Sequence, residues 1–208
     1  AIPERYQQQA LNDSYFTELK SEYQYLAHKF GLQAMDANQW RFLRLRPQNF
    51  PHIRIAQLAH LYYEQRAGLS QLLECESVKQ VRELLATRVT HYWETHYVFG
   101  EKSAKSEKKL SAASLNLQII NTVAPILFAY GKHKNSEKYC ERAFDFLETL
   151  KAEENHIVRM WKEVGLMVET AGDSQALIQL KKEYCDRKDC LRCRIGYEYL
   201  KGSSSLKG

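Results

Sequence analysis

Breaker residues are scarce in this chain, which holds 4 prolines and 9 glycines in 208 residues. Proline and glycine interrupt helices and mark the turns between short strands, so their scarcity favours helices over many strands. Apolar residues also recur at helical spacing, as at Ile55, Leu58, Ala59 and Tyr62. The sequence therefore predicts an all-α protein, a compact array of antiparallel helices on short loops.

Two neighbouring segments depart from the helical pattern. Residues 91–100 concentrate β-forming side chains, so we expect one irregular segment there. Residues 101–109 combine charges with small side chains, which predicts an exposed, mobile linker. We expect a single helical domain over residues 1–201, with subregions 1–100 and 110–201 joined by this linker, and a flexible tail at 202–208.

The most apolar predicted helix, near residues 111–130, contains Pro125. Proline donates no backbone hydrogen bond, and its ring crowds the carbonyl group of Asn121, four residues earlier. We therefore expect a kink at this point, with Asn121 or Thr122 helping to satisfy the freed backbone.

Net charge and hydropathy limit the kinds of binding partner and the cellular compartment that we expect for this protein. The net charge is +5 and the pI is about 8.8, which permits an anionic partner but falls short of a dedicated nucleic-acid binder. No run of eighteen apolar residues occurs, and the N-terminus has no signal-peptide character. We expect a cytoplasmic protein without a membrane segment. The chain begins at Ala1, so we expect a fragment or a processed form.

Cys185, Cys190 and Cys193 form a C-x4-C-x2-C cluster. The C-x2-C spacing lets two thiolates approach one metal ion from a tight turn. The longer pattern resembles part of the plant-type iron–sulfur motif, which needs a fourth cysteine. Zinc or an iron–sulfur cluster is the cofactor that such a site would hold. The fourth ligand would come from one of four residues: Cys75, Cys140, His133 or His156.

Two other interpretations of the cysteine cluster stay open. The basic neighbours Arg187, Lys188, Arg192 and Arg194 would lower the pKa of a thiol and make the cluster redox-sensitive. Alternatively, the cysteines are reduced and help to fix the C-terminal turn. We favour this structural interpretation, without a cofactor, because a structural zinc site usually has two paired spacings and this chain has one.

Four arginines, Arg41, Arg44, Arg46 and Arg54, lie in a stretch without acidic residues and beside aromatic side chains. Arginine next to an exposed aromatic side chain suits phosphate contact with base stacking. The alternative, which we favour on charge grounds, is that the aromatic residues enter the core and the arginines pair with acids such as Asp36 or Glu64. The aromatic residues concerned are Trp40, Phe42 and Phe50.

Motifs that would identify catalysis are missing from the sequence. His91 and His96 are five residues apart, which does not place both rings on one helical face as the H-E-x-x-H motif does. The chain has no glycine-rich phosphate loop and no G-x-S-x-G motif. No catalytic residue is predicted, and the sequence does not decide whether the protein is an enzyme.

Three segments resemble a bacterial family of unknown function: Trp40–Ala59 (WRFLRLRPQNFPHIRIAQLA), Ile120–Gly131 (INTVAPILFAYG) and Cys185–Gly196 (CDRKDCLRCRIG). The resemblance covers most of the chain. Members of the family are about double the length of this chain, so the resemblance implies that it corresponds to their C-terminal half. It implies a missing N-terminal region as a partner, and no catalytic residues.

Three functional hypotheses follow. The leading one is a non-catalytic helical module that binds a partner, nucleic acid in particular, through the Arg41–Arg54 face. The second is a structural zinc site, or an iron–sulfur or redox site, at the cysteine cluster. The third is a structural domain that packs on the missing N-terminal half and would expose an apolar patch when isolated.

Overall fold

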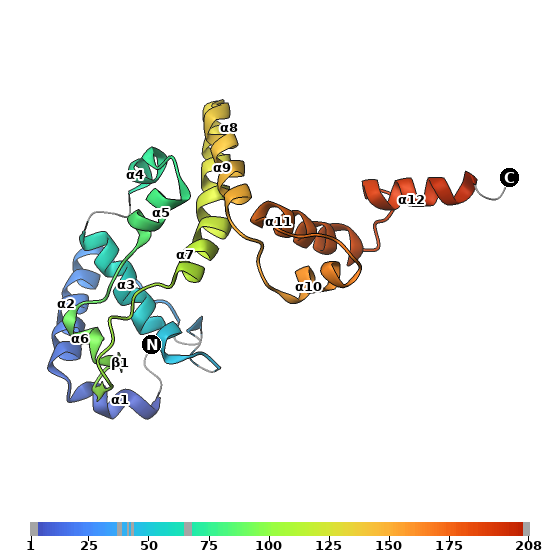
Figure 1. Cartoon of the computed structure of the whole chain (residues 1–208). Coiled ribbons are helices and arrows are strands. Elements are labelled where there is room, and N and C mark those ends of the chain that lie inside the picture. The colour runs from blue at the N-terminus through green and yellow to red at the C-terminus, as the bar shows by residue number, and fades with distance from the viewer. Residues whose placement is uncertain (1–3, 37–38, 41, 43, 65–67, 206–208) are drawn as a thin grey trace. The chain divides into compact units, whose positions relative to one another are not determined.

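The computed structural model describes residues 4–36, 39–40, 42, 44–64 and 68–205 (Figure 1). Helices dominate the chain, and its extended structure among these residues is one short antiparallel pair of strands. The predicted all-α class is therefore confirmed. The chain divides into two compact units: unit 1 comprises residues 1–72 and 82–115, and unit 2 comprises residues 73–81 and 116–208.

Unit 1 begins with two helices, α1 (Glu4–Leu11) and α2 (Ser14–Phe30). Asp13 caps α2 by accepting a hydrogen bond of 3.1 Å from the backbone N–H of Phe16. A 3₁₀ turn, η2 (Pro47–Asn49), leads into α3 (Pro51–Tyr63). Pro51 occupies the first turn of α3, where a missing N–H costs nothing.

The segment expected to be irregular, residues 91–100, contains a single turn of helix and a strand. The turn is α6 (His91–Glu94), and β1 (His96–Val98) pairs antiparallel with β2 (Glu101–Lys102), with His96 opposite Lys102. The prediction of one irregular segment here is confirmed. The core of unit 1 packs α3 against this segment and the residues just before it, through Ile53, Ala56, Val89 and Trp93.

Unit 2 is built around a helical hairpin, in which α8 (Ala124–Lys134) and α9 (Glu137–Thr149) lie side by side (Figure 1). Gly131 allows the close approach of the two helices, because a Cβ atom there would lie 2.7 Å from the Cys140 sulfur. Further helices follow: α10 (His156–Glu163), α11 (Ala171–Leu180), the π-helix η4 (Lys181–Cys185) and α12 (Arg194–Ser205).

Pro125 is accommodated by a change of helix type. Between α7 (Ala112–Gln118) and α8, residues Ile119–Val123 form the π-helix η3, and the Ala124 N–H donates to the Ile119 carbonyl. The Asn121 side-chain amide donates a hydrogen bond of 3.0 Å to the Leu117 carbonyl oxygen. The wider π-helical turn accommodates Pro125, which has no backbone N–H to donate, and the helix continues through it.

Two further helices, α4 (Leu69–Glu74) and α5 (Val78–Leu85), lie at the boundary between the units in sequence. Where a flexible tail is predicted, α12 continues through residues 202–205, and residues 206–208 lie outside the described part. The continuous helix of residues Ala112–Lys134 has the length and the apolar composition of a membrane-spanning helix. One such helix is weak evidence of a membrane protein. A core helix of a soluble protein can have the same length and composition.

Residues 103–109, within the predicted linker, carry no helix or strand but are attached to unit 1. The Ser103 N–H donates a hydrogen bond of 2.7 Å to the Thr95 carbonyl oxygen, and the Ser106 N–H donates one of 2.9 Å to the Glu94 carbonyl oxygen. Lys108 is 5% exposed. The expectation that the whole segment is exposed is wrong at Lys108, because its ammonium group finds backbone carbonyl partners inside unit 1.

Candidate functional site

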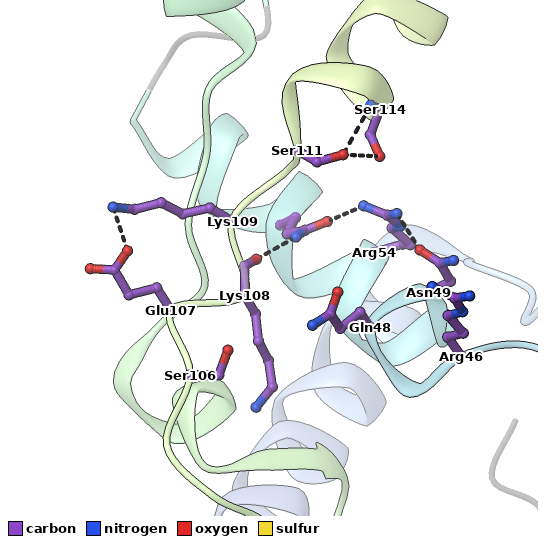
Figure 2. A pocket seen from close by; sticks show the side chains of 11 residues that line it. Arg46, Gln48, Asn49, Arg54, Ser106, Glu107, Lys108, Lys109, Ser111 and Ser114 are labelled. Atoms are coloured by element: carbon purple, nitrogen blue, oxygen red, sulfur yellow. Dashed lines mark hydrogen bonds and ion pairs between the residues drawn. The ribbon is translucent and has the colours of Figure 1, made fainter.

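A cavity of about 540 Å³ opens in unit 1 between residues 46–57 and residues 106–114 (Figure 2). This volume is in the range of sites for small molecules. The lining is polar throughout and consists of arginine, lysine, glutamine, asparagine, serine and glutamate residues. The cavity is therefore suited to a charged or hydroxylated ligand rather than an apolar one.

Local sequence places Arg54 and Asn49 side by side at one wall. Arg46 is extended, as the residue before a proline is expected to be, and Pro47 starts the η2 turn. Pro51 then starts α3, which puts Arg54 one turn into that helix. Arg54 Nη2 donates 2.6 Å to Asn49 Oδ1, across the junction of the two elements.

A second amide completes the support of Arg54. Its Nη1 donates a hydrogen bond of 3.0 Å to Gln57 Oε1, and Gln57 Nε2 donates one of 2.6 Å to the Lys108 carbonyl oxygen. Gln57 is 4% exposed, so its amide is fixed between the guanidinium group and the opposite wall. Both acceptors of Arg54 are neutral, and its positive charge is therefore held in place without being neutralised.

The cavity has an excess of positive charge. Arg46, Arg54 and Lys109 contribute three cations and Glu107 one carboxylate, so these four side chains carry a net charge of about +2. Lys108 also belongs to the lining, but its ammonium group binds backbone carbonyl oxygens and is not counted. Glu107 pairs with Lys109 at 2.6 Å. Burial lowers the pKa of Arg54 from its usual range, but an arginine stays protonated in proteins. The cavity thus presents cationic and neutral donors to an anion.

The Lys108 ammonium group faces away from the cavity and anchors its wall. In Figure 2 its side chain extends in the opposite direction from Arg54. Its Nζ donates to the carbonyl oxygens of Trp93, Glu94 (3.0 Å) and His96 (2.9 Å), at the end of α6. A cation is favourable there because carbonyl groups at a helix C-terminus are partially negative. Burial lowers the pKa of Lys108, and the nearby Glu94 carboxylate partly opposes this.

The structure brings together two of the four predicted arginines. Arg46 and Arg54 line the same cavity, whereas Arg44 is exposed and is not part of the lining. Arg41 lies outside the described residues. Among the ion pairs between described residues, none involves Arg44, Arg46 or Arg54, so the expected pairing with acids is not found for these three.

The aromatic residues near the arginines pack into the unit. Phe50 is buried, and the Phe42 ring contacts the rings of Phe50 (5.7 Å between centroids) and His52 (5.1 Å). Trp40 is partly buried. No aromatic side chain belongs to the described lining of the cavity. The packing interpretation therefore holds for Phe42 and Phe50, and base stacking by these two rings is not supported.

The predicted cysteine cluster begins at the last residue of η4, Cys185, and ends just before α12. Cys185 and Cys190 are exposed, whereas Cys193 is buried. Gly196 packs on the Cys190 backbone, since a Cβ atom there would lie 2.6 Å from the Cys190 carbonyl oxygen. Within the part of the chain that the structure describes, no group of three or more His, Cys, Asp or Glu side chains is arranged to hold a metal ion. The metal site therefore stays a prediction.

His91 and His96 also have separate environments. His91 is exposed and pairs with Glu94 at 3.3 Å. His96 is buried, and its ring stacks on Tyr92 with 4.0 Å between centroids. The sequence did not identify Gln57, Lys109 or the serines of the cavity as functional. No local pattern marks them, because the cavity depends on a contact between Gln57 and Lys108, 51 residues apart.

Comparison with known proteins gives one match. The model of a family described as "Protein of unknown function (DUF2851)" matches residues 5–156. The chain belongs to this family. Every residue that lines the cavity lies inside the matched region, and the cysteine cluster lies outside it. Nothing among the curated proteins or the solved structures matches the chain. The predicted resemblance to a family of unknown function is confirmed at this level.

Proposed function

We propose that the protein is a non-catalytic helical module that binds nucleic acid by contacts to phosphate at the cavity of unit 1. One observation carries the proposal: two neutral amides, Asn49 and Gln57, hold the Arg54 guanidinium group in a polar cavity, and no carboxylate among the described residues pairs with it. A guanidinium group matches the geometry of phosphate oxygens. Arg46 and Lys109 add positive charge to the same cavity.

The packing of Phe42 and Phe50 favours contact with the phosphate backbone over stacking on bases. Contacts to phosphate carry little sequence information and depend strongly on salt. The modest net charge of the whole chain is compatible with this mode, because the positive charge is local to the cavity. The proposal therefore predicts binding that tolerates changes of sequence and weakens with salt.

Fluorescence anisotropy with a labelled single-stranded DNA, at about 50 mM and about 200 mM salt, tests the proposal. Arg46→Gln should weaken binding several-fold and reduce the salt dependence. Arg88→Gln is the matched control, because Arg88 is another exposed arginine of unit 1 that does not line the cavity. No binding at the lower salt, or equal loss in the two variants, would contradict the proposal.

A second candidate function, packing on a partner polypeptide, is favoured by the surface of α2. None of the described residues of this helix is buried. Leu19, Tyr23 and Phe30 are exposed at helical spacing, which gives an apolar stripe. If the stripe binds a partner, replacing Leu19 and Tyr23 by Asn should reduce binding of a hydrophobic dye without lowering the melting temperature. Unchanged dye binding would exclude it.

A further inference from the structure

The charge of the cavity distinguishes between two forms of phosphate. An internal phosphodiester of a nucleic-acid strand carries one negative charge, whereas a phosphomonoester carries about −1.5 to −2 at neutral pH. The net charge of about +2 from Arg46, Arg54, Lys109 and Glu107 matches the phosphomonoester. We propose that the cavity binds the terminal phosphate of a nucleic-acid strand together with its sugar. This inference rests on the proposed function.

The donors of the cavity fit a terminal phosphate. A guanidinium group has five N–H donors, and Arg54 uses one each for Asn49 and Gln57. The remaining donors can reach two phosphate oxygens at once, which is the bidentate arrangement that makes arginine–phosphate contacts strong. A phosphomonoester offers three terminal oxygens for such contacts. Arg46 and Lys109, the second of which pairs with Glu107, line other parts of the same cavity.

The remaining lining fits a sugar rather than a base. Ser106, Ser111 and Gln48 supply hydroxyl and amide groups, which hydrogen-bond to sugar hydroxyl groups and to phosphate oxygens. The described lining contains no aromatic and no aliphatic side chain on which a base could stack. The cavity, at about 540 Å³, falls in the range of small-molecule sites, so a phosphate with its sugar can be accommodated. The base would then stay outside, and recognition would not depend on it.

The pH dependence of binding offers a specific signature. The second pKa of a phosphomonoester is about 6, so the ligand loses negative charge between about pH 7.5 and about pH 5.5. The titratable groups that line the cavity are Arg46, Arg54, Lys108, Lys109 and Glu107; no histidine is among the described lining residues. Ordinary arginine, lysine and glutamate side chains do not titrate in this range. Any loss of preference for a phosphorylated end over this range therefore reports on the ligand.

The test compares single-stranded DNA of one sequence with a 5′-phosphate, a 3′-phosphate or hydroxyl groups at both ends, by anisotropy on the full chain. We expect one phosphorylated end to bind about tenfold more tightly than the hydroxyl-ended strand at about pH 7.5, with the preference reduced near pH 5.5. A free nucleoside monophosphate and inorganic phosphate are added as competitors. Their effect tells whether a strand is needed beyond the phosphate and its sugar.

Variants connect the preference to the cavity. Lys109→Gln and Arg46→Gln should each reduce the preference for the phosphorylated end, whereas Arg88→Gln should retain it. Lys109, Arg46 and Arg88 are all exposed, so these variants should fold, and circular dichroism verifies this. Equal affinity for all three strands would overturn the inference while leaving the proposed function in place. Failure of every strand to bind would overturn both. A preference that survives Arg46→Gln and Lys109→Gln would place the phosphate elsewhere and overturn the inference.

Discussion

The side-chain amide of Gln57 donates a hydrogen bond of 2.6 Å to the carbonyl oxygen of Lys108, and its own oxygen accepts from Arg54 at 3.0 Å. One buried, uncharged side chain therefore connects the cation of the cavity with the opposite wall. Because both groups depend on it, Gln57 determines the shape of the cavity without supplying any of its charge.

Replacing Gln57 by methionine should affect both stability and binding. The change keeps the length of the side chain and removes both hydrogen bonds, which leaves the Lys108 carbonyl oxygen without its partner. We expect a loss of about 2 kcal/mol in the free energy of unfolding, measured with urea. DNA affinity should fall by about fivefold to tenfold because Arg54 is no longer oriented. Gln48→Met is the matched control, since Gln48 lines the same cavity but is exposed. Equal effects of the two changes would contradict the role of Gln57.

Lys108→Met should be strongly destabilising although it removes a buried positive charge. The Nζ atom serves three carbonyl groups, those of Trp93, Glu94 and His96, and each would lose a charged donor. We expect a loss of about 3 kcal/mol in the free energy of unfolding. Lys109→Met is the control, because its exposed side chain pairs with the exposed Glu107 and with no other described residue, and its effect should be below about 0.5 kcal/mol. Similar losses for both lysines would show that Lys108 is not an anchor.

The class of the fold could be predicted because it depends on local signals. The helical spacing in α3, the proline at its start and the β-forming residues near His96 each determine the structure of only a few neighbouring residues. The role of Lys108 could not be predicted in the same way. Charged residues usually stay in water, and the carbonyl groups that Lys108 binds are presented only after α6 and β1 have folded.

The candidate site was predictable in part for the same reason. Arg46 and Arg54 belong to one stretch of sequence, so their clustering follows from the chain itself. The other wall comes from residues 106–114, which sequence composition had assigned to a linker and the start of a helix. For Phe42 and Phe50, entry into the core is the alternative that the modest charge favours, and their packing with each other and with His52 agrees with it.

Asp13 should make the stability of unit 1 sensitive to acid. Its carboxylate accepts hydrogen bonds from the Tyr92 hydroxyl, from Phe16 N (3.1 Å) and from Gly100 N (2.7 Å). Burial alone would raise its pKa, but the hydrogen bonds outweigh this effect and hold the pKa below its usual 3.8. Because the folded-state pKa is the lower one, the stabilisation is fully present above about pH 4 and is lost as pH falls through the folded pKa.

Asp13→Asn tests this linkage by urea unfolding at about pH 7 and below pH 4. We expect the variant to be less stable by about 2 kcal/mol at neutral pH, and to lose less stability than the parent protein on acidification. Asparagine can retain the cap to Phe16 through its oxygen, but its NH2 group cannot accept from Gly100 N, so the difference reports on the loss of the charged acceptor. Asp145→Asn, at an exposed position of α9, should change neither value. A parent protein and an Asp13→Asn variant with parallel pH profiles would show that the Asp13 carboxylate is not the responsible group.

The cysteine cluster should react as separate thiols if it serves the turn rather than a metal ion. Cys185 and Cys190 are exposed, whereas Cys75, Cys140 and Cys193 are buried. Burial also raises the pKa of the Cys75 thiol, although the charge of Arg142 partly opposes this, and the thiolate is the reactive form. A thiol reagent should therefore modify two cysteines rapidly in the native protein and all 5 after unfolding. Stoichiometric zinc or iron in anaerobically purified protein, together with protection of Cys185 and Cys190 until a chelator is added, would instead establish the metal site.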